Sequence, residues 1–161
     1  MPSLAANKLD APQLVADINP GSGSAIVGGL TAINGKLYFA ANNGVGSHEL
    51  WQYDGQNPPQ LVADINPGNN NDTSIPQAPT AYQGKLYFSA GNISNGTELW
   101  EYDGINAPRV IDINPGSSSS LPSFLTVFNG KLYFNADGGN GSGTELWEYD
   151  GTNAPQQVAD V

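Results

Sequence analysis

The sequence has no cysteine and few charged residues. The absence of cysteine excludes a disulfide framework, a thiolate metal site and a cysteine nucleophile. Only 12% of the residues are charged, against roughly a quarter in ordinary soluble domains. No apolar run approaches the length of a membrane-spanning helix, so we expect no membrane insertion. Residues 1–13 also lack the apolar stretch of a signal peptide, so the residues alone leave the localisation open.

Basic residues are especially scarce. Lys and Arg together number 5 against 15 Asp and Glu, which gives a formal net charge of -10 at pH 7. A surface this acidic repels phosphate backbones and anionic lipid, so we expect no nucleic-acid partner. Cations, neutral glycans and other proteins remain compatible with it.

In place of charge, the chain is rich in Gly, Pro, Asn and Ser, which is typical of an all-β protein with many tight turns. One phrase is also written three times: GKLYFAANNGVGSHELWQYDG from Gly35, GKLYFSAGNISNGTELWEYDG from Gly84 and GKLYFNADGGNGSGTELWEYDG from Gly130. A second phrase, DINPG, precedes each copy. The repeating unit of about forty-eight residues lies among the periods of β-propeller blades.

Each unit predicts four short strands. The first strand, at residues 30–33, 79–82 and 125–128, is followed by a two-residue Asn-Gly or Gln-Gly turn. Asn-Gly is a strong hairpin signal, because both central residues of a type I′ turn need positive φ. The second strand begins with KLYF, the third contains ELW, and the fourth has the pattern QLVADI. Four short antiparallel strands repeated at this period predict a β-propeller.

We therefore predict an all-β fold with three propeller blades per chain. A lead-in at 1–13 precedes blade repeats at 14–60, 61–108 and 109–161, and an extra outer-type strand is expected at 11–18. Propellers typically close with four to eight blades, so three blades leave two apolar faces uncovered. We predict a homodimer that forms one six-bladed ring, since two copies give a common ring size. The extra strand either closes that ring against the partner copy or marks only where a longer array was cut.

The segment ELWEYDGT, from Glu145 to Thr152, resembles the ELWxxDGT repeat of large bacterial proteins. The other two copies, ELWEYDGI and ELWQYDGQ, differ from that pattern only at the last position, and the flanking DINPG and NGKLYFAA stretches fit it as well. The resemblance implies a propeller-type repeat in an extracellular or cell-surface setting. It carries over no catalytic residues.

Aromatic residues recur at fixed strand positions, as packing between blades requires. We interpret them as structural core in preference to a sugar-stacking surface. The predicted blade core consists of Phe39, Phe88, Phe134, Trp51, Trp100 and Trp147. One Lys and one Glu also recur in each unit, and we expect them to be paired or hydrogen-bonded for structural reasons. The Asp that precedes each Gly of the ELWxYDG phrase is predicted to cap its own turn.

Polar loops offer the candidate ligand-binding residues. These are Asn42, Asn43, Asn92, Asn95 and Asn140, with Asp137 as a candidate calcium ligand. Calcium prefers six to eight oxygen ligands, and one carboxylate in one loop is a poor start, so we predict no cofactor while calcium stays open.

Two functions of different kinds follow. The first is a non-enzymatic, self-associating propeller scaffold whose assured partner is a second copy of itself. Such a scaffold could be a natural or engineered fragment of a larger repeat protein. The alternative is a lectin-like or calcium-dependent module that binds a glycan or protein through its loops. An enzyme, a hydrolase or lyase, would need acidic groups facing each other across a pocket, whereas the sequence offers turn-position Asp; we therefore predict that the chain is not an enzyme.

Overall fold

The computed structural model describes residues 12–25, 28–44, 48–67 and 76–159. Within these ranges the chain is all-β, with three antiparallel four-stranded sheets and no helix. Strands that neighbour each other in the chain also pair in space, so each sheet is a meander. The strands are β1 (Gly28–Ile33), β2 (Lys36–Asn42), β3 (His48–Tyr53), β4 (Gln60–Ala63), β5 (Gln77–Tyr82), β6 (Lys85–Asn92), β7 (Gly96–Tyr102), β8 (Arg109–Ile111), β9 (Ser123–Phe128), β10 (Lys131–Asp137), β11 (Thr144–Tyr149) and β12 (Gln156–Ala159).

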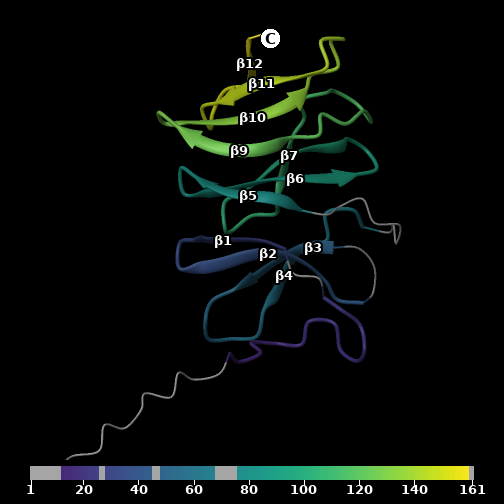
Figure 1. Cartoon of the computed structure of the whole chain (residues 1–161), viewed down its shortest axis with the longest axis vertical. Coiled ribbons are helices and arrows are strands. Elements are labelled where there is room, and N and C mark those ends of the chain that lie inside the picture. Colours follow the sequence, from purple (N-terminus) through teal and green to yellow (C-terminus); the bar gives the residue numbers. More distant parts are fainter. Residues whose placement is uncertain (1–11, 26–27, 45–47, 68–75, 160–161) are drawn as a thin grey trace, which may run out of the picture.

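The three sheets, called blade 1 (β1–β4), blade 2 (β5–β8) and blade 3 (β9–β12), stack in chain order (Figure 1). Their first strands, β1, β5 and β9, contact one another in turn. The described part of the chain begins at one end of the stack, and β12 lies at the other end (Figure 1). This arrangement confirms the all-β prediction and is consistent with a β-propeller-like fold.

The predicted hairpins join the first and second strands of each blade. Asn34 and Gly35 have φ angles of 50° and 75°, and Asn129 and Gly130 have nearly the same pair. Positive φ at both central residues defines the type I′ turn, whose twist matches that of the flanking strands. The hairpin prediction is therefore confirmed.

The first strand of each blade begins two residues earlier than the sequence pattern indicates. The pairing of β1 with β2, β5 with β6 and β9 with β10 continues past a register shift. At that shift Gly29, Ala78 and Phe124 all have positive φ. A bulge places an extra residue in one strand, so the alternation of side chains breaks there. The sequence pattern misses the start of these strands for that reason.

Each blade has two apolar faces, because successive side chains of a strand point to opposite sides. We call the side of Leu37, Phe39 and Tyr53 the front face, and the side of Tyr38 and Leu50 the back face. The front faces of the other blades carry Leu86, Phe88 and Tyr102, and Leu132, Phe134 and Tyr149. The back faces carry Tyr87 and Leu99, and Tyr133 and Leu146.

The back face of one blade packs on the front face of the next. One core cluster joins Tyr38 and Leu50 of blade 1 to Phe88 of blade 2, and a second cluster repeats this contact between blades 2 and 3. The Tyr38 and Tyr102 rings meet edge to face at 5.8 Å. The Tyr87 and Tyr149 rings meet in the same way at 5.9 Å. The two boundaries between blades are therefore copies of one contact.

Replacing Leu99 with Ala tests this contact. Leu99 is fully buried between blades 2 and 3, so we expect Leu99→Ala to lower the free energy of unfolding by about 2–5 kcal/mol. Ile105→Ala is the matched control, since Ile105 is 87% exposed and should change stability by less than about 0.5 kcal/mol. Urea denaturation followed by tryptophan fluorescence measures both. Equal losses in the two variants would contradict the assigned core.

Candidate functional site

The two ends of the blade stack expose apolar positions that the inner boundaries bury. On the back faces, Leu50 and Leu99 are 0% exposed, whereas the equivalent Leu146 of blade 3 is 38% exposed. On the front side, Leu125 of blade 3 is 9% exposed, whereas the equivalent Leu30 of blade 1 is 61% exposed. The same side-chain positions are thus covered inside the stack and uncovered at its ends.

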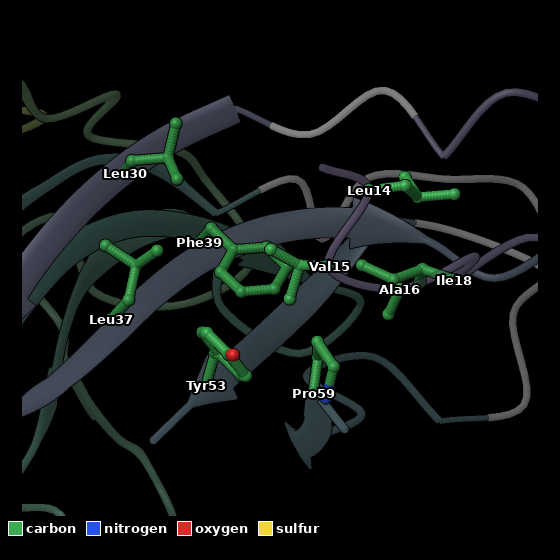
Figure 2. A pocket seen from close by; sticks show the side chains of 9 residues that line it. All are labelled: Leu14, Val15, Ala16, Ile18, Leu30, Leu37, Phe39, Tyr53 and Pro59. Atoms are coloured by element: carbon green, nitrogen blue, oxygen red, sulfur yellow. The ribbon is translucent and has the colours of Figure 1, made fainter. Parts of the chain in front are cut away.

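The front face of blade 1 holds an apolar cavity of about 230 Å³. Figure 2 shows side chains from two sources around it, blade 1 and residues 12–18, the part of the expected extra strand that the structure describes, which we call the lead-in segment. The lining residues are Leu14, Val15, Ala16, Ile18, Leu30, Leu37, Phe39, Tyr53 and Pro59. In blade 2 the equivalent face, around Phe88, is filled by Tyr38 and Leu50 of blade 1. The cavity therefore marks the place where a preceding back face would pack.

The back face of blade 3 combines the uncovered Leu146 with a charged pair. Lys131 Nζ lies 2.5 Å from Glu148 Oε1, and Tyr133 Oη donates to the same carboxylate at 3.1 Å. The hydrogen bond from Lys131 lowers the pKa of Glu148, with a further contribution from Tyr133. The Tyr133 ring also lies 6.1 Å from the ring of Phe128.

Inside the stack, the equivalent carboxylate on blade 2 has one more cation. Glu101 accepts from Lys85 at 3.2 Å, from Arg109 at 2.7 Å and from Tyr87 at 3.2 Å. Burial raises the pKa of Glu101, but the hydrogen bonds from Arg109 and Lys85 outweigh it and lower the pKa overall. The recurring Lys therefore has a structural partner in each blade, and in blade 1 that partner is Gln52.

A buried carboxylate fastens the connection between blades 2 and 3. Glu98 is 0% exposed and accepts from the backbone N–H of Ile113 at 2.9 Å and of Ser120 at 2.8 Å, and from Ser120 Oγ at 2.5 Å. Burial raises the pKa of Glu98 against the opposing effect of these hydrogen bonds. Glu49 accepts from Ile65 N–H in the same manner. Both carboxylates hold the backbone of a connection between blades, and Glu98 is closed to solvent.

Most of the loop residues predicted to bind ligands make hydrogen bonds within their own blade. Asn92 Oδ1 accepts from Ser94 and Asn95 N–H, and Asp137 Oδ1 accepts from Gly139 N–H at 2.8 Å. The side-chain amides of Asn95 and Asn140 instead reach the fourth-strand region of their blades, at Asp112 and Gln157. Asn42 accepts from Gly44 N–H, and Asn43 lies in the same loop. The structure brings these residues to loops at the ends of the second strands, and a glycan or protein ligand there stays a prediction.

No metal centre is evident in the described ranges, where no three His, Asp or Glu side chains gather in a group that could hold an ion. Asp137 stands in the third loop with Asn140 and without a second carboxylate in the sequence of that loop. Calcium binding by this loop stays a prediction. Among the described residues, no helix is long and apolar enough to cross a membrane.

Four of the predicted core aromatics, Phe88, Phe134, Trp100 and Trp147, lie between blades, whereas Phe39 and Trp51 lie on the front face of blade 1. Phe39, Phe88, Phe134 and Trp100 are buried, whereas Trp51 and Trp147 are half-buried. Each Trp donates its indole N–H to a carbonyl of the neighbouring strand in its own blade. The Trp side chains therefore have packing and hydrogen-bonding roles in all three blades.

Sequence reasoning missed the complementarity of the two faces. Alternation within KLYF puts Leu and Phe on one side of the strand and Tyr on the other, and this signal was available in every repeat. It also missed the network around Glu101, because Arg109 has no counterpart in the other repeats: Gln60 and Gln156 take its place.

A scan with protein-family models finds no match to this chain, and a comparison with curated proteins finds none either. Among solved structures, the chain is similar to Zg3597, a family 117 glycoside hydrolase from the marine bacterium Zobellia galactanivorans. The likeness covers 82% of this chain at 19% sequence identity, with a TM-score of 0.47. The chain spans 45% of the length of that glycoside hydrolase.

This comparison corrects the prediction that the chain is not an enzyme. That prediction rested on the position of the acidic residues in turns, whereas the similar solved structure is a glycoside hydrolase. We therefore no longer predict that the chain lacks enzymatic activity. At this identity and TM-score the likeness assigns neither a reaction nor a catalytic residue to this chain.

The Asp caps of the turns after the third strands predict an acid-dependent stability. Asp103 Oδ1 accepts from Ile105 and Asn106 N–H at 2.8 Å, while Oδ2 accepts from Asn106 Nδ2. These bonds, led by that from the Asn106 side chain, lower the pKa of Asp103 to about 2. Asp54 in blade 1 has the same bonds and the same pKa. The predicted turn capping is confirmed.

The sign of the effect follows from the lowered pKa. The unfolded-state pKa is about 3.9, so the stabilisation by Asp103 is present above about pH 4 and is lost as the pH falls through about 2. We expect the unfolding free energy of the wild type to decline between these values. Asp103→Asn should make the decline shallower, and Asp54→Asn with Asp103→Asn shallower still. Urea titrations at several pH values measure the slope, Ile105→Ala serves as control, and a slope unchanged in the double variant would refute the assignment.

Proposed function

We propose that the chain is a self-assembling β-propeller module in which two copies close one six-bladed ring. The observation that carries the proposal is the complementarity of the two ends. The back face of blade 3 presents Tyr133 and Leu146, the residues whose counterparts fill the front faces of blades 2 and 3. Among the three described front faces, that of blade 1 lacks them and holds a cavity in their place.

The tyrosine series supports this pairing. Tyr38 on a back face meets Tyr102 on the next front face, and Tyr87 meets Tyr149. The next pair in the series is Tyr133 of one copy with Tyr53 of the other. An edge-to-face aromatic pair contributes roughly 0.5–1.5 kcal/mol beyond the area that it buries.

A hydrogen-bond series along the first strands supports the same pairing. Thr31 Oγ1 donates to Pro79 O at 2.5 Å. Thr80 Oγ1 lies 3.3 Å from Leu125 O of the next blade and 3.1 Å from Ala78 O of its own strand, so its hydroxyl is shared between the two carbonyls. Thr126 is the equivalent residue of blade 3, and its hydroxyl makes the own-strand bond alone, to Phe124 O at 3.0 Å. In the ring Thr126 would donate to the carbonyl of Leu30 in the second copy.

Two copies can cover both uncovered faces of each chain at once. Each copy presents one front face and one back face, so two copies joined head to tail around a two-fold axis leave no end uncovered. Six blades fall within the usual range of propeller rings, whereas nine blades from three copies do not. We also propose that the chain is an ELWxxDGT-type repeat protein, on the basis of its sequence resemblance to those repeats. That resemblance suggests an extracellular or cell-surface setting. The loops of such a ring would form a repeated surface for binding a glycan or protein.

The solution mass of a Leu146 variant tests the proposal. At about 0.15 M salt, which screens the repulsion between two acidic copies, we expect light scattering to give the wild type twice the 16.8 kDa mass of one chain. Leu146→Glu puts a charge into the new boundary and should give 16.8 kDa. Ile105→Glu makes the same change at an exposed site away from both ends and should keep the doubled mass.

Circular dichroism of each variant confirms that the blades remain folded. A folded wild type that stays at 16.8 kDa across a dilution series would refute the six-bladed ring. So would a Leu146→Glu variant that keeps the doubled mass.

A further inference from the structure

We propose that the lead-in segment, residues 12–18, forms the fourth strand of blade 3 in the other copy, beside β11, in place of that copy's own β12. This inference rests on the proposed ring and specifies which chain segment closes it. Residues 12–21 read PQLVADINPG, the same ten residues as 59–68, which contain β4. The lead-in segment is therefore a complete fourth-strand sequence, yet the described structure includes it in no sheet.

The residues that follow the lead-in segment are already docked as a connection between blades. Asn42 N–H donates to Ala25 O at 2.9 Å, and Asp137 N–H donates to Ser120 O at 2.8 Å in the connection between blades 2 and 3. Each bond joins the end of a second strand to the segment that enters the same blade. Residues 18–25 thus approach blade 1 as residues 113–120 approach blade 3.

An Asn within each connection makes the same contacts, which is a second likeness between residues 18–25 and 113–120. Asn19 Nδ2 donates to Ser24 O at 3.2 Å, and Asn114 Nδ2 donates to Ser119 O at 3.5 Å. The Asn19 and Asn114 side chains also lie so close to Gly44 and Gly139 that neither glycine has room for a Cβ. Residues 18–25 therefore have, in the single chain, the same contacts as the equivalent residues between blades 2 and 3.

A chain docked in this way directs the lead-in segment to the position of a fourth strand in a preceding blade. Val15, Ala16 and Ile18 line the cavity over Phe39 (Figure 2). In the stack, Val62, Ala63 and Ile65 pack against the core that contains Phe88. In the described structure no strand pairs with the lead-in segment at this position. In the proposed ring, β9, β10 and β11 of the other copy arrive at that place.

The residue opposite the central Trp favours the lead-in segment over β12. Leu61 pairs with Trp51 and Val110 pairs with Trp100, but Gln157 of β12 pairs with Trp147. Residue 14 stands at the position of Leu61, so the exchange would place Leu14 opposite Trp147. Cross-strand pairs between aromatic and aliphatic side chains stabilise a sheet by roughly 0.2–1 kcal/mol each. The exchange would also cover Leu14, which is 83% exposed in the single chain.

Chain connectivity favours the same exchange. At both inner boundaries the fourth strand of one blade continues directly into the first strand of the next. Only the lead-in segment can give the boundary between copies this connection, because it continues into β1 of its own chain. Once β1 of one copy packs on blade 3 of the other, the lead-in segment is held beside β11 at a high effective concentration, as β12 already is, so the choice between them depends on their contacts with β11.

Introduced cysteine pairs test which strand lies beside β11. The chain has no native cysteine, and a disulfide requires Cβ atoms within about 3.5–4.5 Å. Gln156 pairs with Glu148, and Gln60 pairs with Gln52 at the equivalent place in blade 1. Residue 13 stands at the position of Gln60. We compare three full-length double variants: Gln13→Cys with Glu148→Cys, Glu148→Cys with Gln156→Cys, and Gln52→Cys with Gln60→Cys as the control for the register.

The expected result is a covalent dimer for the pair at 13 and 148 on a non-reducing gel after mild oxidation. A disulfide within one chain is out of reach for this pair, because the lead-in segment and β11 lie at opposite ends of the stack (Figure 1). The pair at 148 and 156 should keep two free thiols by titration, while the control pair oxidises within its chain.

The outcomes separate this inference from the proposed ring. Light scattering of the reduced variants reports the assembly independently of the disulfides. A doubled mass, an oxidised pair at 148 and 156 and a reduced pair at 13 and 148 would overturn the exchange and leave the six-bladed ring standing. A single-chain mass for all reduced variants and the wild type would overturn both.

Discussion

The structure depends on the packing of one blade's back face against the next blade's front face. A four-stranded sheet that is apolar on both sides cannot bury itself, so each blade needs a neighbour on either side. Burial of one Leu or Phe side chain contributes roughly 1.5–3 kcal/mol, and each boundary buries several of them. The hairpins, the turn caps and the Glu98 contacts keep these faces in register. The uncovered ends are a consequence of the same design, because three blades provide two boundaries and two leftover faces.

Much of the fold could be predicted from sequence, because each turn and strand pattern occurs three times in the repeats. The Asn34–Gly35 turn and the alternation in KLYF act over a few residues, so their signals survive without knowledge of the tertiary structure. The bulge at Ala78 could not be predicted, since a non-Gly residue with positive φ leaves no mark in the hydrophobic pattern. The network around Glu101 was also hidden, because it depends on the single Arg109 that only blade 2 contains.

The candidate site was less predictable than the fold. Loop Asn and Asp residues resemble ligand-binding groups in sequence, yet Asn92 and Asp137 use their oxygens to hold the loop backbone. Short polar side chains have this second use in every tight loop, so composition alone cannot separate the two roles. The informative signal was instead a comparison between equivalent positions, as in Leu50, Leu99 and Leu146. Only a structure supplies the difference in burial among them.

The central claim is that the boundary between two copies repeats the two boundaries inside each chain. A crystal structure of the assembled protein tests it most directly, through the rings of Tyr133 in one copy and Tyr53 in the other. We expect an edge-to-face pair with a centroid distance close to the 5.8 and 5.9 Å of the inner boundaries. Two copies joined front face to front face, or a chain that leaves both rings open to solvent, would contradict it.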